Sequence, residues 1–343
     1  MTVLMPVYNV EPYLEESVRS ILSQTYTAFA CLVIDDGSTD RTREILETFR
    51  DPRLRVVRNE ENLGLTRTLN RGLSMIDSEL VARMDGDDVA MPSLLEREVA
   101  FLDSHPDVAV VGVQARAMDA RGRRLHQVAL WHRGLRRPPG GVAMAWYRMF
   151  DTPFVHPGTM FRRSVVHEYP ADAPMAEDAA LWARVGRTHA LANLTETLVA
   201  YRVNRSGSMT FNLAQRARLG YVGWKSKLVH GLLRDGLEWS DELLERCASL
   251  WVRANEPGDS LTRDEVRELL DAIDACSARF DALHPEARRD RFIATHRATL
   301  VQRAMAHAPS PRAFAKMLRL DAATALLALP HIAGKALLRR RRA

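Results

Sequence analysis

The fold is decided by residues 30–40, which read ACLVIDDGSTD. The apolar run Ala30–Ile34 is expected to form a buried strand. Two aspartates follow it, after which Gly37 permits a tight turn and Ser38 or Asp40 can cap the next helix. A strand that passes through a polar turn into a helix is the repeating unit of a parallel sheet with crossover helices, and this stretch therefore predicts an α/β fold.

The same unit recurs along the first hundred residues. In the first helix, Leu14, Val18, Ile21 and Leu22 recur at the 3.6-residue period after Pro12. Beyond residue 115 the alternation becomes irregular, and from about Thr210 onward the sequence indicates helices alone. We therefore expect a mostly parallel, Rossmann-like sheet flanked by helices in residues 1–209 and an all-helical region in residues 210–343. The predicted strands are Val3–Tyr8, Ala30–Ile34, Leu54–Arg58, Leu80–Met84 and Val108–Val113.

Composition narrows the class of protein. Of the 343 residues, 46% are hydrophobic and 27% are charged, which excludes a disordered, collagen-like or membrane-embedded chain. The three cysteines, Cys31, Cys247 and Cys276, are too far apart in sequence for a zinc knot or a redox pair. The chain begins directly with a predicted strand instead of a basic and then apolar leader, so a cytoplasmic location is expected.

The charge is unevenly distributed. Residues 291–343 carry a net charge of +10, whereas the preceding 290 residues carry −5. Phe314, Met317 and Leu318 form an apolar stripe beside basic residues, and the chain ends in Arg339–Arg342. This pattern predicts either a peripheral contact of residues 312–342 with an anionic membrane or a helix packed on the catalytic domain with a disordered basic end. The basic stretch lacks interleaved aromatic residues, which argues against nucleic acid as the partner.

Two acidic clusters follow predicted strands. Asp35-Asp36 and Asp85-Gly86-Asp87-Asp88 would both lie where the carboxyl ends of parallel strands meet. Several carboxylates at one edge repel each other unless a cation balances them, and oxygen ligands favour Mg²⁺ or Mn²⁺. The alternatives are that the first pair only caps and turns the chain and that the second cluster is a solvated loop.

At this point the sequence resembles glycosyltransferase family 2, a large inverting family with the GT-A fold. The resemblance covers about residues 1–205. It is carried by four strings in order, followed by His156–Arg163 and Glu177–Trp182. The four strings are Met5–Asn9, Val33–Asp40, Asn59 with Asn62–Leu65, and Arg83–Asp88. The resemblance implies an enzyme that transfers a sugar from a nucleotide diphosphate to an acceptor hydroxyl, for instance in cell-envelope polysaccharide synthesis.

The resemblance also implies donor-binding residues. Pro6, Tyr8 and Asp36 would surround the nucleotide base, with the Asp36 carboxylate accepting a base N–H. Arg58 or Arg83 would approach the diphosphate. Asp85 and Asp87 match the Asp-x-Asp element that touches the ribose and a Mn²⁺ or Mg²⁺ ion, with Asp87 the better choice for direct coordination.

Asp178 matches the family's general base. A carboxylate within reach of the acceptor hydroxyl can take its proton as that oxygen attacks the anomeric carbon, and one such displacement inverts the anomeric configuration. The neighbouring candidates for the acceptor site are Glu177, His156 and Trp182. Each has a plainer alternative, because acids favour a helix start, His156 could be a loop histidine, and Trp182 is more typical of packing. The segment Tyr201–Asn204 has Asn204 where relatives often place a histidine, which argues against a metal or phosphate role for that position.

Two other functions are compatible with an acidic α/β sheet. A nucleotidyltransferase that makes nucleotide sugars should carry a Gly-rich, basic loop after the first strand, and Pro6-Val7-Tyr8-Asn9 is neither. A non-catalytic scaffold that binds nucleotide sugars would be favoured by loss of Asp87 or Asp178, and both are present. A phospho-acceptor receiver domain would require a different order of acidic residues and lysine.

Overall fold

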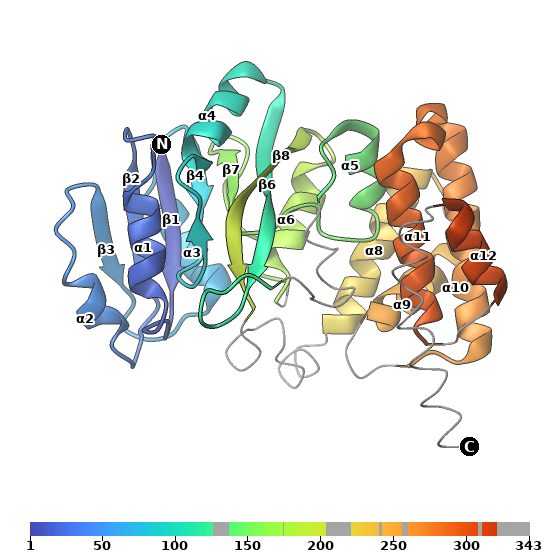
Figure 1. Cartoon of the computed structure of the whole chain (residues 1–343), viewed down its shortest axis with the longest axis horizontal. Coiled ribbons are helices and arrows are strands. Elements are labelled where there is room, and N and C mark those ends of the chain that lie inside the picture. The colour runs from blue at the N-terminus through green and yellow to red at the C-terminus, as the bar shows by residue number, and fades with distance from the viewer. Residues whose placement is uncertain are drawn as a thin grey trace. The chain divides into compact units, whose positions relative to one another are not determined.

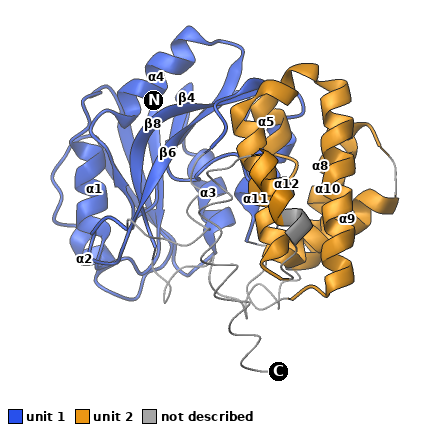
Figure 2. Ribbon diagram, turned by 45° about the vertical axis from the view of Figure 1, so that its right-hand side comes forward, with its two compact units in different colours: residues 1–141, 152–211 blue, residues 142–151, 212–343 orange. Residues whose placement is uncertain are grey.

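The computed structural model describes residues 1–125, 137–173, 175–203, 221–239, 242–255, 260–307 and 311–320. The chain forms two compact units, which Figure 2 shows in different colours. Unit 1 contains residues 1–141 and 152–211, and unit 2 contains residues 142–151 and 212–343. Residues 142–151, which the sequence prediction placed in the first domain, thus belong to the second unit.

Unit 1 is an eight-stranded mixed sheet with helices on both faces (Figure 1), as the α/β prediction requires. The strand order is β3-β2-β1-β4-β7-β6-β8-β5. The strands are β1 (Thr2–Val7), β2 (Ala30–Asp35), β3 (Leu54–Arg58), β4 (Leu80–Arg83), β5 (Val89–Ala90), β6 (Val108–Met118), β7 (Thr159–Arg162) and β8 (Ala190–Arg202). The helices are α1 (Leu14–Leu22), α2 (Thr42–Leu46), α3 (Leu65–Leu73), α4 (Leu94–Ser104) and α6 (Glu177–Val185).

The parallel half of the sheet follows the predicted pattern. β1 pairs in parallel with both β2 and β4, and β3 extends the sheet beyond β2. Leu14, Val18 and Ile21 are fully buried in the core cluster beneath the sheet, so the predicted face of α1 is confirmed. Because these strands run in parallel, the loops that follow β1, β2 and β4 emerge at the same edge of the sheet.

The other half of the sheet lies where the sequence appeared irregular. β7 runs antiparallel between β4 and β6, and β6 pairs in parallel with the 13-residue β8. The prediction ended the fifth strand at Val113, but β6 continues to Met118 through the half-buried Gln114 and the exposed Arg116. Strands with polar positions and register shifts lack the unbroken apolar run that signals a buried strand.

Unit 2 is helical throughout its described residues. Its core is built from the buried faces of the long helices together with Trp146 and Phe150 from the segment 142–151. Trp251 Nε1 donates to the Phe150 carbonyl at 2.9 Å. The elements are α5 (Gly141–Tyr147), α8 (Tyr221–Leu237), α9 (Glu242–Asn255), α10 (Arg263–Leu283), the 3₁₀ helix η3 (Pro285–Arg289), α11 (Arg291–Met305) and α12 (Pro311–Leu320).

A buried polar cluster ties the segment 142–151 into unit 2. The Asp151 carboxylate pairs with Arg303 NH1 at 2.8 Å and lies 3.5 Å from His296 Nε2. Trp146 Nε1 donates to His296 Nδ1 at 3.0 Å. Burial alone would raise the pKa of Asp151, but the charge of Arg303 and the hydrogen bond from His296 outweigh it and hold that pKa well below its usual range. The cluster therefore keeps an ionised carboxylate inside the helical unit.

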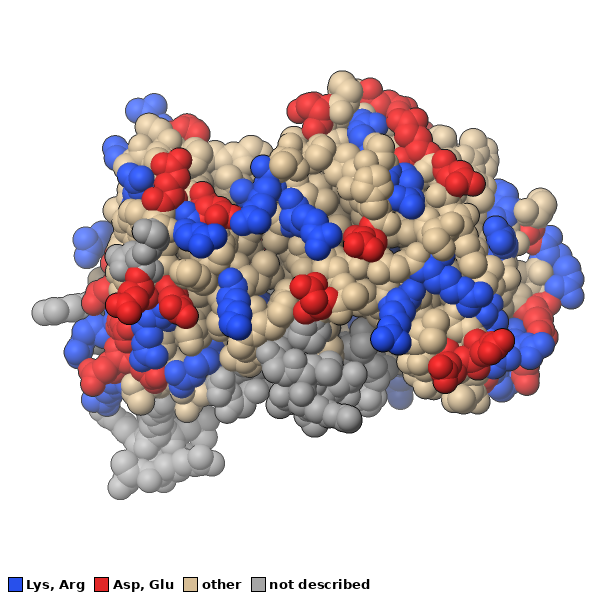
Figure 3. Space-filling model, turned by 180° about the vertical axis from the view of Figure 1, so that it is seen from behind, with Lys and Arg blue, Asp and Glu red and all other residues tan. Residues whose placement is uncertain are grey.

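The described part of the basic tail packs on its own unit. Met317 of α12 is fully buried with Ala298, Val301 and Met305, whereas Leu318 stays exposed. The inner part of the predicted apolar stripe is therefore covered by α11, and the predicted basic end at residues 321–342 lies outside the described residues. None of the helices in the described ranges has the length and apolar character that crossing a bilayer requires. On the face in Figure 3, the described basic and acidic side chains are interspersed.

A buried carboxyl group in α4 provides a test of stability against pH. Glu98 is fully buried, and neither of its oxygens has a hydrogen-bond partner among the described residues. Burial raises its pKa well above the usual value. The folded state therefore keeps a proton on Glu98 that the unfolded state releases above about pH 4.3. The contribution of Glu98 to the free energy of unfolding consequently falls as the pH rises from about 4.3 towards the pKa of Glu98 in the folded state.

We expect Glu98→Met to raise the free energy of unfolding by about 1–3 kcal/mol at pH 7.5, because an unsatisfied buried polar group is removed. The gain should shrink at pH 5, and urea titrations at both pH values measure it. Glu96→Met, at an exposed position in the same helix, is the control and should change stability by less than about 0.5 kcal/mol. A loss of stability in Glu98→Met at pH 7.5 would contradict this account.

Candidate active site

The acidic turn that follows β4 is held close to the end of β1. Residue 86 must be glycine for this approach, because a Cβ there would lie 2.6 Å from Val7 Cγ1. Ser17 Oγ of α1 donates to the Asp85 carbonyl at 2.8 Å. The turn is thus positioned by a close backbone contact on one side and by a helix on the other.

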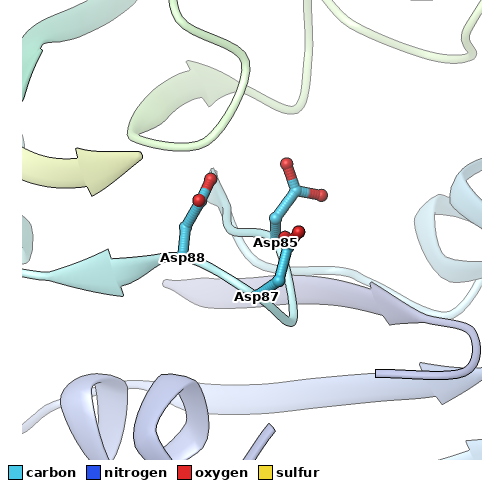
Figure 4. A group of neighbouring side chains, drawn as sticks. All are labelled: Asp85, Asp87 and Asp88. Carbon is cyan, nitrogen blue, oxygen red and sulfur yellow. The ribbon is translucent and has the colours of Figure 1, made fainter. Parts of the chain in front are cut away.

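Asp85, Asp87 and Asp88 gather their carboxylates at this turn, as Figure 4 shows. Ligand oxygens of the three lie within 4.8 Å of one another. Asp85 pairs with Arg83 NH1 at 2.5 Å, and Asp88 Oδ1 accepts the backbone N–H of Arg202 at 2.6 Å. Among the residues that the structure describes, the Asp87 carboxylate accepts only from its own backbone N–H. Asp88 Oδ2 also lacks a donor among the described residues, but Asp88 is buried. Asp87, which is partly exposed and has no arginine partner, is therefore the most available carboxylate.

The electrostatics of the turn favour a bound cation. Burial and then the charge of Asp85 raise the pKa of Asp87 to about 6, and burial and then Asp87 raise the pKa of Asp88 well above its usual value. Of the three carboxylates, only Asp85 has an ion-pair partner among the described residues, Arg83, because the Arg202 guanidinium pairs with Glu16. Carboxylate oxygens are the ligands that Mg²⁺ and Mn²⁺ prefer, so this set of residues fits such an ion.

Arg83 lies inside the protein rather than on a surface open to a diphosphate. It is 2% exposed, and its Nε atom has no hydrogen-bond partner among the described residues. Burial acts to lower the pKa of Arg83, but the charge of Asp85 and the bond to it outweigh that effect and raise it. Arg83 therefore neutralises the charge of Asp85 from the protein interior.

The predicted base-binding residues divide into exposed and internal ones. Tyr8 is 44% exposed just beyond β1, whereas Pro6 is buried within that strand. Asp36 Oδ1 accepts from Asn59 Nδ2 at 2.6 Å and from the Leu63 N–H at 2.9 Å. Its Oδ2 accepts from the N–H of residue 64 at 3.0 Å. The Asp36 carboxylate thus holds the loop at residues 59–64, with little capacity left for a base N–H.

Arg58, the other predicted diphosphate contact, lies at the same edge of the sheet. Its Nε atom is 3.4 Å from Asp35 Oδ2, and its NH2 atom donates to the Ser38 carbonyl at 3.3 Å. The side chain of Arg58 is 43% exposed. It is thus the more accessible of the two predicted arginines.

The acid pair Glu177-Asp178 opens α6, as the sequence predicted. Asp178 is partly exposed, and its Oδ1 accepts the Ala179 N–H at 2.7 Å. Glu177 is buried, and burial followed by the charge of Asp178 raises the pKa of Glu177 to about 7. The charge of Asp85 also contributes to this shift, which places the acid pair within electrostatic range of the turn after β4. Of the pair, Asp178 is therefore the more exposed carboxylate.

The aromatic candidates for the acceptor site are internal. Trp182 is fully buried, and its ring meets Phe154 at 5.2 Å and His156 at 6.3 Å between centroids. A ring with no exposed face cannot stack on a sugar, so Trp182 is a packing residue. His156 Nε2 lies 3.1 Å from the Tyr169 hydroxyl, and burial and then Arg83 lower the pKa of His156 well below its usual value. His156 is therefore a neutral, hydrogen-bonded side chain.

Sequence reasoning missed two residues next to the acidic groups. Tyr169 is buried, and its pKa is raised by burial and by the charges of Glu177, Asp178 and Asp85. Arg202 is buried at the end of β8 and contacts the turn after β4. No local signal marks Tyr169, but the segment Tyr201–Asn204 already resembled a family string that contains an arginine.

The sheet presents aspartates, and not a glycine-rich phosphate loop, at the carboxyl ends of its parallel strands. The fold and the position of these acidic residues are those of the GT-A class. Residues 2–169 match the family described as glycosyl transferase family 2, and the chain belongs to that family. The matched region ends before Asp178.

Relatives and solved structures agree with this assignment. The chain is 33% identical over 216 residues to an uncharacterized glycosyltransferase of Haemophilus influenzae, covering 60% of this chain and 65% of that protein, somewhat less than two thirds of its length. It is 30% identical over 210 residues to the amylovoran biosynthesis glycosyltransferase AmsE of Erwinia amylovora, covering 59% and 75%. The crystal structure of S. aureus TarS 1–349 in complex with UDP-GlcNAc matches with a TM-score of 0.57 at 19% identity over 91% of each chain, a likeness of fold.

Proposed function

We propose that this protein transfers a sugar from a nucleotide diphosphate to an acceptor hydroxyl with inversion at the anomeric carbon. The observation that carries the proposal is that the charges of Asp178, at the start of α6, and of Asp85, in the carboxylate turn Asp85–Asp88, both act on the buried Tyr169. One group can activate an acceptor while the other holds the donor.

Donor binding is assigned to the edge of the sheet where β1, β2 and β4 end. Tyr8 is exposed there and offers a ring for the base. Asp36 keeps the loop at residues 59–64 in place through its three accepted hydrogen bonds. Arg58 offers a half-exposed guanidinium for the diphosphate.

The turn at residues 85–88 would hold Mg²⁺ or Mn²⁺ mainly through Asp87, with Asp85 fixed by Arg83. Such an ion, when bound, offsets the negative charge that develops on the departing diphosphate. The protein supplies the placement of the carboxylates and the buried arginines that keep them together.

Asp178 would act as the general base. Its carboxylate accepts the acceptor's hydroxyl proton as that oxygen attacks the anomeric carbon, and the bond from the anomeric carbon to the diphosphate breaks in the same step. Glu177 is unsuited to this role because it is buried and its pKa of about 7 leaves much of it protonated at neutral pH.

For the acceptor, we propose a growing polysaccharide or a lipid-linked glycan. AmsE, a relative that is 30% identical, is named for the biosynthesis of amylovoran, which supports a polysaccharide pathway. A contact with an anionic membrane would rest on the basic residues that follow Leu320, because Met317 already packs on α11.

A donor screen tests this function. Nucleotide sugars with different bases are incubated with the protein, and release of the nucleoside diphosphate is measured with Mn²⁺ and with EDTA. We expect release from a restricted set of donors with Mn²⁺ and loss of that release in EDTA. Formation of pyrophosphate from a nucleoside triphosphate and a sugar phosphate would instead identify a nucleotidyltransferase.

A further inference from the structure

Arg202 connects the acidic turn to three other parts of unit 1. Its side chain is 1% exposed although it ends the strand β8. The backbone N–H of Arg202 donates to Asp88 Oδ1 at 2.6 Å, and its Nε donates to the Asp87 carbonyl at 2.7 Å. Arg202 therefore contacts the side chain of Asp88 and the backbone of Asp87, the last two residues of the turn.

The rest of the guanidinium is held from outside the turn. NH1 donates to the carbonyls of Asp119 and Ala120, at 3.1 and 3.3 Å, in the turn that follows β6. NH2 pairs with Glu16 Oε2 of α1 at 2.7 Å. The Tyr13 ring lies beneath the guanidinium carbon, 4.5 Å from its centroid. Every nitrogen of the group thus has an acceptor, and its orientation is determined by several elements.

We propose that Arg202 is a positioning residue that sets the conformation of the turn at Asp87-Asp88 for cation binding. This inference rests on the proposed function, since it concerns the same cation. Asp88 is buried and its Oδ1 accepts the Arg202 N–H, so Asp88 serves as the anchor of the turn, and the partly exposed Asp87 is left to face the ion. The Asp87 carbonyl is pulled towards β8, which orients the side chain from the same residue.

A lysine could not replace Arg202 in this role. An ammonium group is a single point of charge, whereas the acceptors of Arg202 surround a planar group with three nitrogens. Lysine would keep the positive charge beside Glu16 but would give up most of the bonds to Asp87, Asp119 and Ala120. The hydrogen bond from the backbone N–H of residue 202 to Asp88 does not depend on the Arg202 side chain. We therefore expect the turn to shift in position but to keep its fold.

The test is calorimetric titration of Mn²⁺ into metal-free protein. We expect Arg202→Lys to weaken Mn²⁺ binding by about 10–100-fold, as is typical when a residue that orients a ligand is changed. Arg162→Lys is the matched control. Arg162 also donates to several carbonyls, those of Val108 and Leu102 among them, but it lies opposite Leu80 at the other end of β4. It should lower stability without changing Mn²⁺ affinity.

The outcomes separate the two proposals. If the unaltered protein does not bind Mn²⁺, the metal site of the proposed function is wrong. If it binds Mn²⁺ and a folded Arg202→Lys binds it equally well, or if both arginine variants weaken binding alike, Arg202 has no positioning role. Should Arg202→Lys fail to fold by circular dichroism, Glu16→Gln removes the negative charge of one exposed partner of the guanidinium. That variant should weaken Mn²⁺ binding by about two- to fivefold, and unchanged affinity would overturn the proposal.

Discussion

Asp178→Asn is expected to abolish most sugar transfer while leaving donor binding intact. The amide keeps the shape of the side chain and can still accept the Ala179 N–H, but it cannot take a proton from an acceptor hydroxyl. Loss of a general base typically costs about 10²–10⁴-fold in rate. Turnover with a donor identified by the screen, and titration of the nucleoside diphosphate with Mn²⁺, measure the two quantities separately.

Asp172→Asn is a suitable control for this variant, because Asp172 is exposed in the loop that precedes α6. It should leave both transfer and donor binding unchanged. Glu177→Gln addresses the neighbouring acid, which is buried and not expected to contact the acceptor. Full transfer by Asp178→Asn would exclude Asp178 as the base.

The second large effect is expected for Asp87→Ala. Removing the carboxylate that other protein donors leave available should eliminate Mn²⁺ binding and with it metal-dependent donor binding. The ion contributes several kcal/mol to a transition state of this kind, which corresponds to at least about a hundredfold in rate. Calorimetry with Mn²⁺ and nucleoside diphosphate release both report the loss.

Stability distinguishes Asp87 from its neighbour. Asp87 lies in a repulsive environment of like charges, so Asp87→Ala should leave the free energy of unfolding of the metal-free protein unchanged or raise it. Asp85→Ala should instead destabilise the protein by about 3–5 kcal/mol, because it leaves the buried Arg83 without its carboxylate. Equal Mn²⁺ binding by Asp87→Ala and the unaltered protein would show that the turn does not use Asp87.

Much of unit 1 could be predicted because its signals are local. The strands predicted at Ala30–Ile34 and Leu54–Arg58 correspond to β2 and β3 within one residue at each end. The acidic turn after β4 and the acid pair of α6 lie at element ends, as the family resemblance implied. β7 and β8 escaped prediction because their pairing depends on partners far along the chain and their faces are only partly apolar.

The sequence by itself determined the α/β class, the positions of the acidic residues and the family, because apolar runs, turn residues and motif order are properties of short segments. Only the tertiary structure decided how those acids differ: Asp85 is paired with Arg83, Asp88 with Arg202, and Asp87 is left available. It also placed Trp182 in the core and Asp151 in the helical unit. The physical reason is that burial and hydrogen bonding join distant parts of the chain. The Arg202 backbone N–H and the Asp88 carboxylate, for example, are 114 positions apart, and no local pattern records their contact.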